Sequence, residues 1–267
     1  MGLVNRILGP FLLLLPDNNR IQRIWKIAQI DFKKRYYNDS FGVLWALINP
    51  FFRISIYYFV FKTIMNVQIE NYALFLFNGI IMYGTFGEVT KGGMNLLQAK
   101  GYLIETIKFD ITDLYISHSI SVLIGFFYNI LAYLLISVIT GVALTWYVLL
   151  LPFILINVLM IGVGIGFILS VLKIYFKDIK HIWDLLLLAG FWVSGIFFNS
   201  EVLFEKYPVF VYANPLVGII QHTRNLLLFG KGLDPMLASI NLLHGIIFLV
   251  IGYIIFSKYS KKALEKI

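Results

Sequence analysis

The 267-residue chain has no cysteine and few charged residues. Without cysteine it can form no disulfide, no thiolate nucleophile and no cysteine-ligated metal site. Asp, Glu, Lys and Arg make up only 13% of the residues and 60% are hydrophobic, and the mean hydropathy is +0.83. Because soluble domains carry about 25% charged residues, this composition predicts an integral membrane protein. The connections between its apolar runs are short, so we expect one membrane domain and no separate soluble one.

Motifs for self-contained chemistry are also missing. The nearest match to a nucleotide-binding G-x-x-x-x-G-K-[ST] loop is "NLLLFGKGLD", which has Asn225 in place of the first glycine and Gly232 in place of Ser or Thr. We therefore expect no ATP site in this chain. We also expect no bound metal or cofactor, because the four histidines lack the spacing of metal ligands. These histidines are His118, His181, His222 and His244.

Six apolar runs reach the length of about 20 residues that a bilayer-spanning helix needs. They cover residues 43–65, 72–95, 114–139, 147–172, 182–199 and 237–257. The predicted fold is an all-α integral membrane protein with six transmembrane helices. We divide it into a cytoplasmic and interfacial N-terminal segment (1–42), a transmembrane domain (43–257) and a basic tail (258–267).

Lysine and arginine set the predicted orientation. Of the 22 in the chain, 17 lie in the N-terminal segment, the connections 91–113 and 173–181, and the C-terminal tail, whereas the connections 66–71 and 140–146 have none. By the positive-inside rule both termini are cytoplasmic. The net charge of +8 then reflects topology, and we expect no nucleic-acid partner.

The N-terminal segment predicts a helix in the membrane surface. In "RIQRIWKIAQIDFKKRYY", which begins at Arg20, apolar residues recur at helical spacing and basic residues occupy the other faces. The preceding "ILGPFLLLLPDNN" is short and has no small-residue cleavage site, so we expect an interfacial or re-entrant lead-in and not a cleaved signal.

Two cytoplasmic connections have features of docking elements. "LLQAKGYLIETIKFDITDLY" carries an apolar stripe among charges, and "KIYFKDIKHI" joins the fourth and fifth spans tightly. Two short amphipathic helices on one face would suit a soluble partner, whereas each alone is also compatible with a loop on the headgroups.

Polar groups and aromatic rings within the spans indicate a substrate path. Arg53 and Glu88 lie at similar depths, where an ionisable group costs about 2.5–3.5 kcal/mol, and we expect them either to pair structurally or to face a water-filled path. The runs "PFFRISIYYFVF" and "FWVSGIFFN" would suit a glycan if they share a lining, since aromatic rings stack on sugars; ordinary lipid-facing or core aromatics are the alternative. The candidates are Phe51, Phe52, Arg53, Tyr57, Tyr58, Glu88, Trp192, Phe197 and Phe198.

Small residues and helix breakers give two packing predictions. Gly162, Gly166 and Ser170 recur every four residues, which favours close helix packing. The stretch 200–236 is interrupted by Pro208 and Pro215, so we expect short re-entrant or surface helices before the last span, acting as a lid over an exit or as a static cap.

Four pieces of sequence occur in a fairly specific order from about residue 20 onward. They are "DFKKRYYNDSFGVLWALINPFF", "YFKDI" before the fifth span, "NP" at 214–215 and "QHTRNLLLFG" at 221–230. In this order they resemble the membrane subunit of type-2 ABC exporters. The likeness is greatest to the branch that exports lipid-linked polysaccharides such as O-antigen, capsule or teichoic acid.

The resemblance implies a homodimeric transport subunit of the cytoplasmic (inner) membrane, working with two copies of a separate ATPase that binds ATP and Mg. "YFKDI" would then belong to a short helix that couples the ATPase to the spans. Implied ATPase contacts are Leu103, Ile104, Lys108, Tyr175, Lys177, Asp178 and Ile179, and Lys34 and Arg35 would attract a lipid diphosphate. The alternatives are a type-2 exporter of drugs or peptides and a membrane-embedded glycosyl- or acyltransferase.

Overall fold

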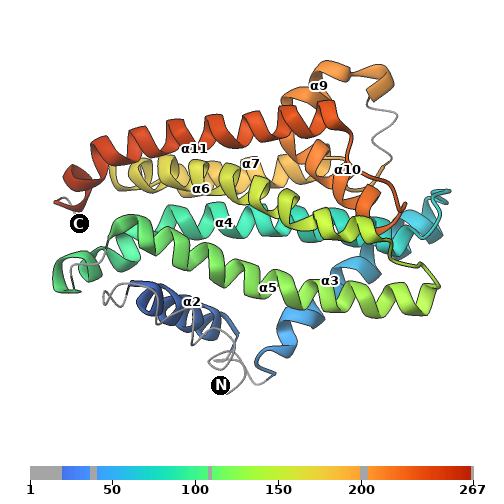
Figure 1. Ribbon diagram of the computed structural model, residues 1–267, viewed down its shortest axis with the longest axis horizontal. Coiled ribbons are helices and arrows are strands. Elements are labelled where there is room, and N and C mark those ends of the chain that lie inside the picture. The colour runs from blue at the N-terminus through green and yellow to red at the C-terminus, as the bar shows by residue number, and fades with distance from the viewer. Residues whose placement is uncertain (1–19, 37–40, 108–109, 199–203, 266–267) are drawn as a thin grey trace.

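The computed structural model describes residues 20–36, 41–107, 110–198 and 204–265, and among these it contains helices and turns but no strand. Long helices run lengthwise beside one another (Figure 1). The predicted all-α membrane fold is confirmed. The lead-in predicted before residue 20 lies outside the described residues.

The helices of the described residues follow one another along the chain. They are α2 (Arg20–Tyr36), α3 (Leu44–Tyr58) with its π-helical continuation η1 (Phe59–Ile64), α4 (Tyr72–Ile107), α5 (Ile111–Thr140), the 3-10 turn η2 (Trp146–Leu150), α6 (Leu151–Tyr175), α7 (Ile179–Val193), α9 (Pro208–Ala213), α10 (Pro215–Leu227) and α11 (Pro235–Leu264).

Five of the described segments are long and apolar enough to cross a membrane, and they match five of the six predicted spans. The run predicted at 182–199 corresponds to α7, which has 15 residues and is therefore about 22 Å long. It ends early because the chain turns at Ser194 and Gly195, where Gly195 has a φ of +75°. The six-span prediction agrees with the fold in outline, with α7 shorter than expected.

Close packing of α6 between α4 and α11 forms the centre of the bundle (Figure 1). Gly166 lies against Gly93 of α4, where an added Cβ would be 3.3 Å from the Gly93 Cα. Ser170 accepts a hydrogen bond of 2.7 Å from the Tyr115 hydroxyl. The predicted small-residue face of α6 is thereby confirmed. On the side facing α11, a Cβ on Gly164 would overlap the backbone carbonyl of Phe248, a contact that the sequence pattern did not predict.

Helix α2 forms as predicted, and its apolar side is covered by α5 (Figure 1). Ala28 is fully buried, and Phe32 stacks on Tyr128 of α5 with 5.6 Å between ring centroids. The guanidinium of Arg20 forms an ion pair with the carboxylate of Asp113, with 2.7 Å between the nearest nitrogen and oxygen. Its hydrogen bonds to this carboxylate raise the pKa of Arg20. Part of the apolar pattern therefore packs on α5, whereas Ile21 and Trp25 stay exposed. The membrane-surface position of α2 remains a prediction.

The short helices expected before the last span are α9 and α10. Asn214 caps α10 by accepting a hydrogen bond from the Leu216 amide at 3.2 Å. One turn from the end of α10, the fully buried Arg224 donates to the carbonyls of Gly195 and Ile196, both at 2.8 Å. Its guanidinium carbon lies 3.4 Å from the centroid of the Phe75 ring. Arg224 thus fastens α10 to α4 and to the turn after α7.

We predict that Gly164→Ala destabilises the bundle, because its Cβ would overlap a backbone atom of α11 that cannot rotate away. Overpacking of this kind costs about 1–3 kcal/mol, which should lower the thermal unfolding midpoint of the detergent-purified chain. Gly87→Ala is the control, since a Cβ there meets nothing within 4 Å. Equal midpoints for the two variants would contradict the packing argument.

We predict a larger loss for Arg224→Met. The substitution leaves the carbonyls of Gly195 and Ile196 without their donor, and each unpaired buried group costs about 1–3 kcal/mol. Lys231→Met removes an exposed charge from the same stretch and should change stability by less than about 0.5 kcal/mol. Urea or thermal unfolding in detergent measures the stability of both variants. Unchanged stability of the Arg224→Met variant would show that Arg224 does not hold α10 to α4 and to the turn after α7.

Candidate functional site

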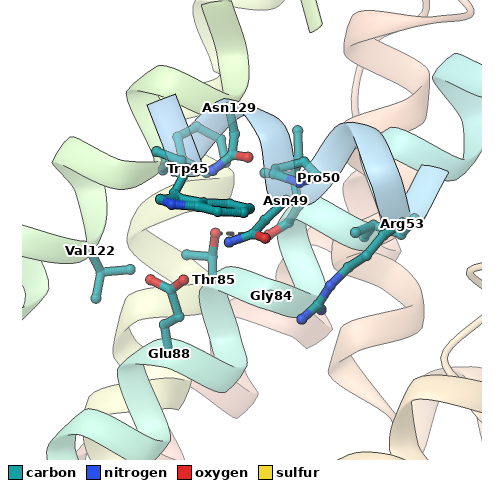
Figure 2. A pocket seen from close by; sticks show the side chains of 13 residues that line it. Trp45, Asn49, Pro50, Arg53, Gly84, Thr85, Glu88, Val122 and Asn129 are labelled. Carbon is teal, nitrogen blue, oxygen red and sulfur yellow. Dashed lines mark hydrogen bonds between the residues drawn. The ribbon is translucent and has the colours of Figure 1, made fainter. Parts of the chain in front are cut away.

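A polar cavity of about 150 Å³ lies between α3, α4 and α5 (Figure 2). Asn49 and Arg53 of α3, Thr85 and Glu88 of α4 and Asn129 of α5 line it. Trp45 covers one wall (Figure 2). Five hydrogen-bonding side chains within apolar helices predict a site that holds water or a polar ligand.

Local sequence opens this cavity. Pro50 lies inside α3, and proline cannot donate the hydrogen bond that would reach the carbonyl of residue 46. On the facing helix, Gly84 has no side chain to fill the space, and a Cβ there would meet nothing within 4 Å. The cavity is therefore bounded by the part of α3 that lacks one backbone hydrogen bond and by the part of α4 that has no side chain at Gly84.

Of the two alternatives given for Arg53 and Glu88, the structure supports a shared polar space. Both line the same cavity, and Figure 2 places them on opposite sides of Gly84. The ion pair that Glu88 makes is with Arg35 of α2. Direct pairing with Arg53, the other alternative, is not observed, because α2 brings Arg35 to the carboxylate. Lys34, the other candidate for a diphosphate, is exposed on α2.

The two aromatic runs do meet. Phe197 lies 5.1 Å from Tyr57, 4.6 Å from Phe61 and 4.9 Å from Trp192, measured between ring centroids. Phe197 itself is 5% exposed, so it packs in the core as the alternative interpretation expected, whereas Trp192 is 49% exposed. The two aromatic runs therefore form one cluster, in which the Phe197 side chain is buried and the Trp192 side chain is exposed.

The remaining aromatic candidates lie outside this cluster. Phe51 packs on Phe77 at 6.2 Å and Tyr58 on Tyr72 at 6.4 Å. Phe52 is 66% exposed, and Phe198 is partly buried against the main core. These four are spread over several contacts, so the structure does not bring the full candidate set into one lining.

The predicted ATPase contacts occupy different structures from those expected. The first connection continues α4 as far as Ile107 and is not a separate helix; Lys108 and the side chains of Leu103 and Ile104 lie outside the described residues. In the second connection α6 ends at Tyr175 and α7 begins at Ile179. The expected short coupling helix is therefore wrong: residues 176–178 are too few for one helical turn of 3.6 residues.

This turn, residues 176–178, carries exposed side chains. Phe176 is 64% exposed, and Lys177 and Asp178 are exposed beside it. The Phe176 amide donates to the Leu172 carbonyl at 2.8 Å, and the His181 amide donates to the Asp178 carbonyl at 2.9 Å. The turn is thus hydrogen-bonded to both helices, and a force on it would reach α6 and α7 directly.

Sequence reasoning missed the contacts that hold α7 to α4. Lys91 pairs with Asp184 at 2.7 Å, and Trp183 donates from its indole to the Thr90 hydroxyl at 3.1 Å. Tyr83 donates to the Leu187 carbonyl at 2.6 Å. An available signal was Asp184, an ionisable residue within a predicted span. In the same way Asn49 and Asn129 were polar interruptions of apolar runs that pointed to the cavity.

Comparison with known proteins agrees with this architecture. The family model described as "ABC-2 type transporter" matches residues 22–228. An "O-antigen export system permease protein RfbA" of Klebsiella pneumoniae is 29% identical over 241 residues, which is 90% of this chain and 92% of that protein. Its namesake in Myxococcus xanthus is 24% identical, covering 73% and 75% of the two chains. The "Polysialic acid transport protein KpsM" of Escherichia coli is 22% identical, covering 75% and 79%.

The family match spans most of the chain, and it includes the cavity, the aromatic cluster and the turn between α6 and α7. The relatives carry transport names and are matched over nearly their whole length or three quarters of it. Together with five helices that are long enough to span a bilayer, these matches establish a multi-pass transport component. The chain belongs to the ABC-2 type transporter family.

Proposed function

We propose that this chain is the transmembrane subunit of an exporter that moves a lipid-linked polysaccharide out across the cytoplasmic membrane. The observation that carries the proposal is the match over 90% of the chain to a protein named for O-antigen export. The aromatic surface around Phe197 and Trp192 supports it, because rings with one open face suit sugars.

Energy for transport comes, in this proposal, from two copies of a separate ATPase that binds ATP and Mg, and two copies of this chain form the passage. The sequence offers no intact nucleotide-binding loop of its own. In this proposal both termini face the cytoplasm, which the distribution of lysine and arginine supports by the positive-inside rule. On that side the exposed side chains of Phe176, Lys177 and Asp178 in the turn 176–178 would contact the ATPase.

The cavity between α3, α4 and α5 is the proposed place where the lipid diphosphate is first held. Arg53 lines it, and Arg35 reaches its edge through the pair with Glu88. A diphosphate is a better partner for two guanidinium groups than one carboxylate, because it offers more charge and bidentate acceptors. Lys34, exposed one residue before Arg35, adds positive charge at the approach. The incoming headgroup would displace Glu88 from Arg35.

We predict that an ATPase co-purifies with the tagged chain in mild detergent. Combining Lys177→Glu with Asp178→Lys should abolish this association or should uncouple ATP hydrolysis from export. Exchanging the two charges keeps the net charge but reverses the pattern on the turn. The matched control is Glu205→Lys combined with Lys206→Glu, another exposed neighbouring pair, which should retain the ATPase. Absence of any ATPase in several mild detergents would refute the exporter function and favour the membrane-embedded transferase.

We predict that Arg53→Gln lowers export at least about tenfold, since losing a hydrogen bond to a charged group costs about 1.5–3 kcal/mol, or roughly a factor of ten or more in binding. Surface polysaccharide is measured by quantitative staining of whole cells. Lys258→Gln removes an exposed positive charge from α11 and should export normally. Normal export by Arg53→Gln, at equal protein level, would remove the cavity from the substrate path.

A further inference from the structure

A second cavity, of about 280 Å³, lies among α9, α10 and the start of α11. These elements stand at the end of the bundle away from the C-terminus (Figure 1). The lining side chains are Phe204, Tyr212, Gln221, His222, Asn225, Asp234 and Leu237. None of them belongs to the cavity around Arg53 or to the aromatic cluster around Phe197, so this cavity is a separate feature.

His222 has an unpaired ring nitrogen beside this cavity. The residue is 2% exposed, and its Nε2 atom has no hydrogen-bond partner within the part of the chain that the structure describes. Buried polar groups are nearly always paired, and an unpaired one costs about 1–3 kcal/mol. Because His222 is one of the residues that line the cavity, its unpaired ring nitrogen lies beside the space that a guest would fill.

The other polar side chains are held in place by hydrogen bonds. Gln221 and Asn225 are one helical turn apart on α10, and the Gln221 amide donates to Asn225 Oδ1 at 3.3 Å. Asp234 caps α11, its Oδ1 accepting from the Leu237 amide at 2.8 Å. Amides both donate and accept, whereas the carboxylate accepts, so the wall presents oriented partners of both kinds at little further cost in side-chain entropy.

The cavity also has an aromatic wall. Phe204 and Tyr212 meet edge to face with 6.1 Å between ring centroids. A sugar ring has hydroxyl edges for amides and a carboxylate and an apolar face for an aromatic ring. The lining includes the acidic Asp234 but no lysine or arginine, which disfavours a phosphate and favours an uncharged polyol. The volume lies near the lower end of ligand sites, about 300–1,000 Å³, and suits one sugar unit.

We propose that this cavity binds one uncharged sugar residue of the exported polysaccharide on the outer side of the membrane. The proposal rests on the proposed function, which supplies both the glycan and the outward orientation of α9 and α10. Holding one sugar unit here, while the ATPase resets, keeps the exported part of the polymer from sliding back.

The test uses the full chain with its partner ATPase in cells that make the polysaccharide. The photoreactive residue p-benzoylphenylalanine replaces Tyr212 at the cavity wall or, as control, Val209 on the same short helix, which is 80% exposed. After irradiation, we expect a glycan-stained adduct of the chain at position 212, at least about fivefold above that at 209 and absent from cells lacking the polysaccharide. Adding Asn225→Leu should reduce the adduct by a similar factor.

A label at Phe204, on the same wall, repeats the experiment if the chain labelled at 212 does not assemble. Equal adducts at the cavity and at 209, or none at 212 and 204 in cells that export normally, would overturn the sugar site and leave the transport function standing. Failure of the unlabelled chain to support any export or to bind an ATPase would instead overturn the proposed function on which the site depends.

Discussion

Direct backbone contact along α6 is the constraint on which the rest of the structure depends. Lipid tails are as apolar as the helices, so helices associate in a membrane through packing and not through the hydrophobic effect. Gly166 meets Gly93 of α4, and Gly164 meets the backbone of α11 on another side. With α6 fixed between two long helices, the bundle gains a rigid centre. Polar contacts add to this packing elsewhere: Arg20 ties α2 to α5, and Arg224 ties α10 to the turn after α7.

Polar contacts also hold α7 at several points along its length. Lys91 and Asp184 join it to α4 near its start, and Tyr83 binds its backbone at Leu187. At its far end, Arg224 holds the turn that follows it. This short helix therefore has an exposed turn at one end and a turn held by Arg224 at the other, and a shift of the helix as a unit would be felt at both. In the proposed exporter, α7 would connect the ATPase contact to α10.

Helix type and order could be predicted from the sequence, since runs of about 20 apolar residues have few alternatives. The stripe at Gly162 and Gly166 predicted packing correctly because small residues at four-residue spacing have one main use. Partners were harder to predict. Pairing with Arg53 was one of two alternatives for Glu88, but its partner is Arg35, and no periodicity tells which of two cations lies closer in the fold. The turn at 176–178 was expected to be a helix because charge pattern alone does not set where α6 ends.

Arg224 shows why some functional elements stay hidden in the sequence. No sequence pattern distinguishes it from the other cations of the stretch 200–236, yet it is fully buried and donates to two carbonyls. Those carbonyls are free to accept because Gly195 turns the chain there and ends α7 early. An unsatisfied helix end in an apolar setting requires a donor, and a long guanidinium on α10 can supply two. The shortness of α7 and the burial of Arg224 are therefore one feature, which places α10, and with it the cavity at His222, over the end of the bundle.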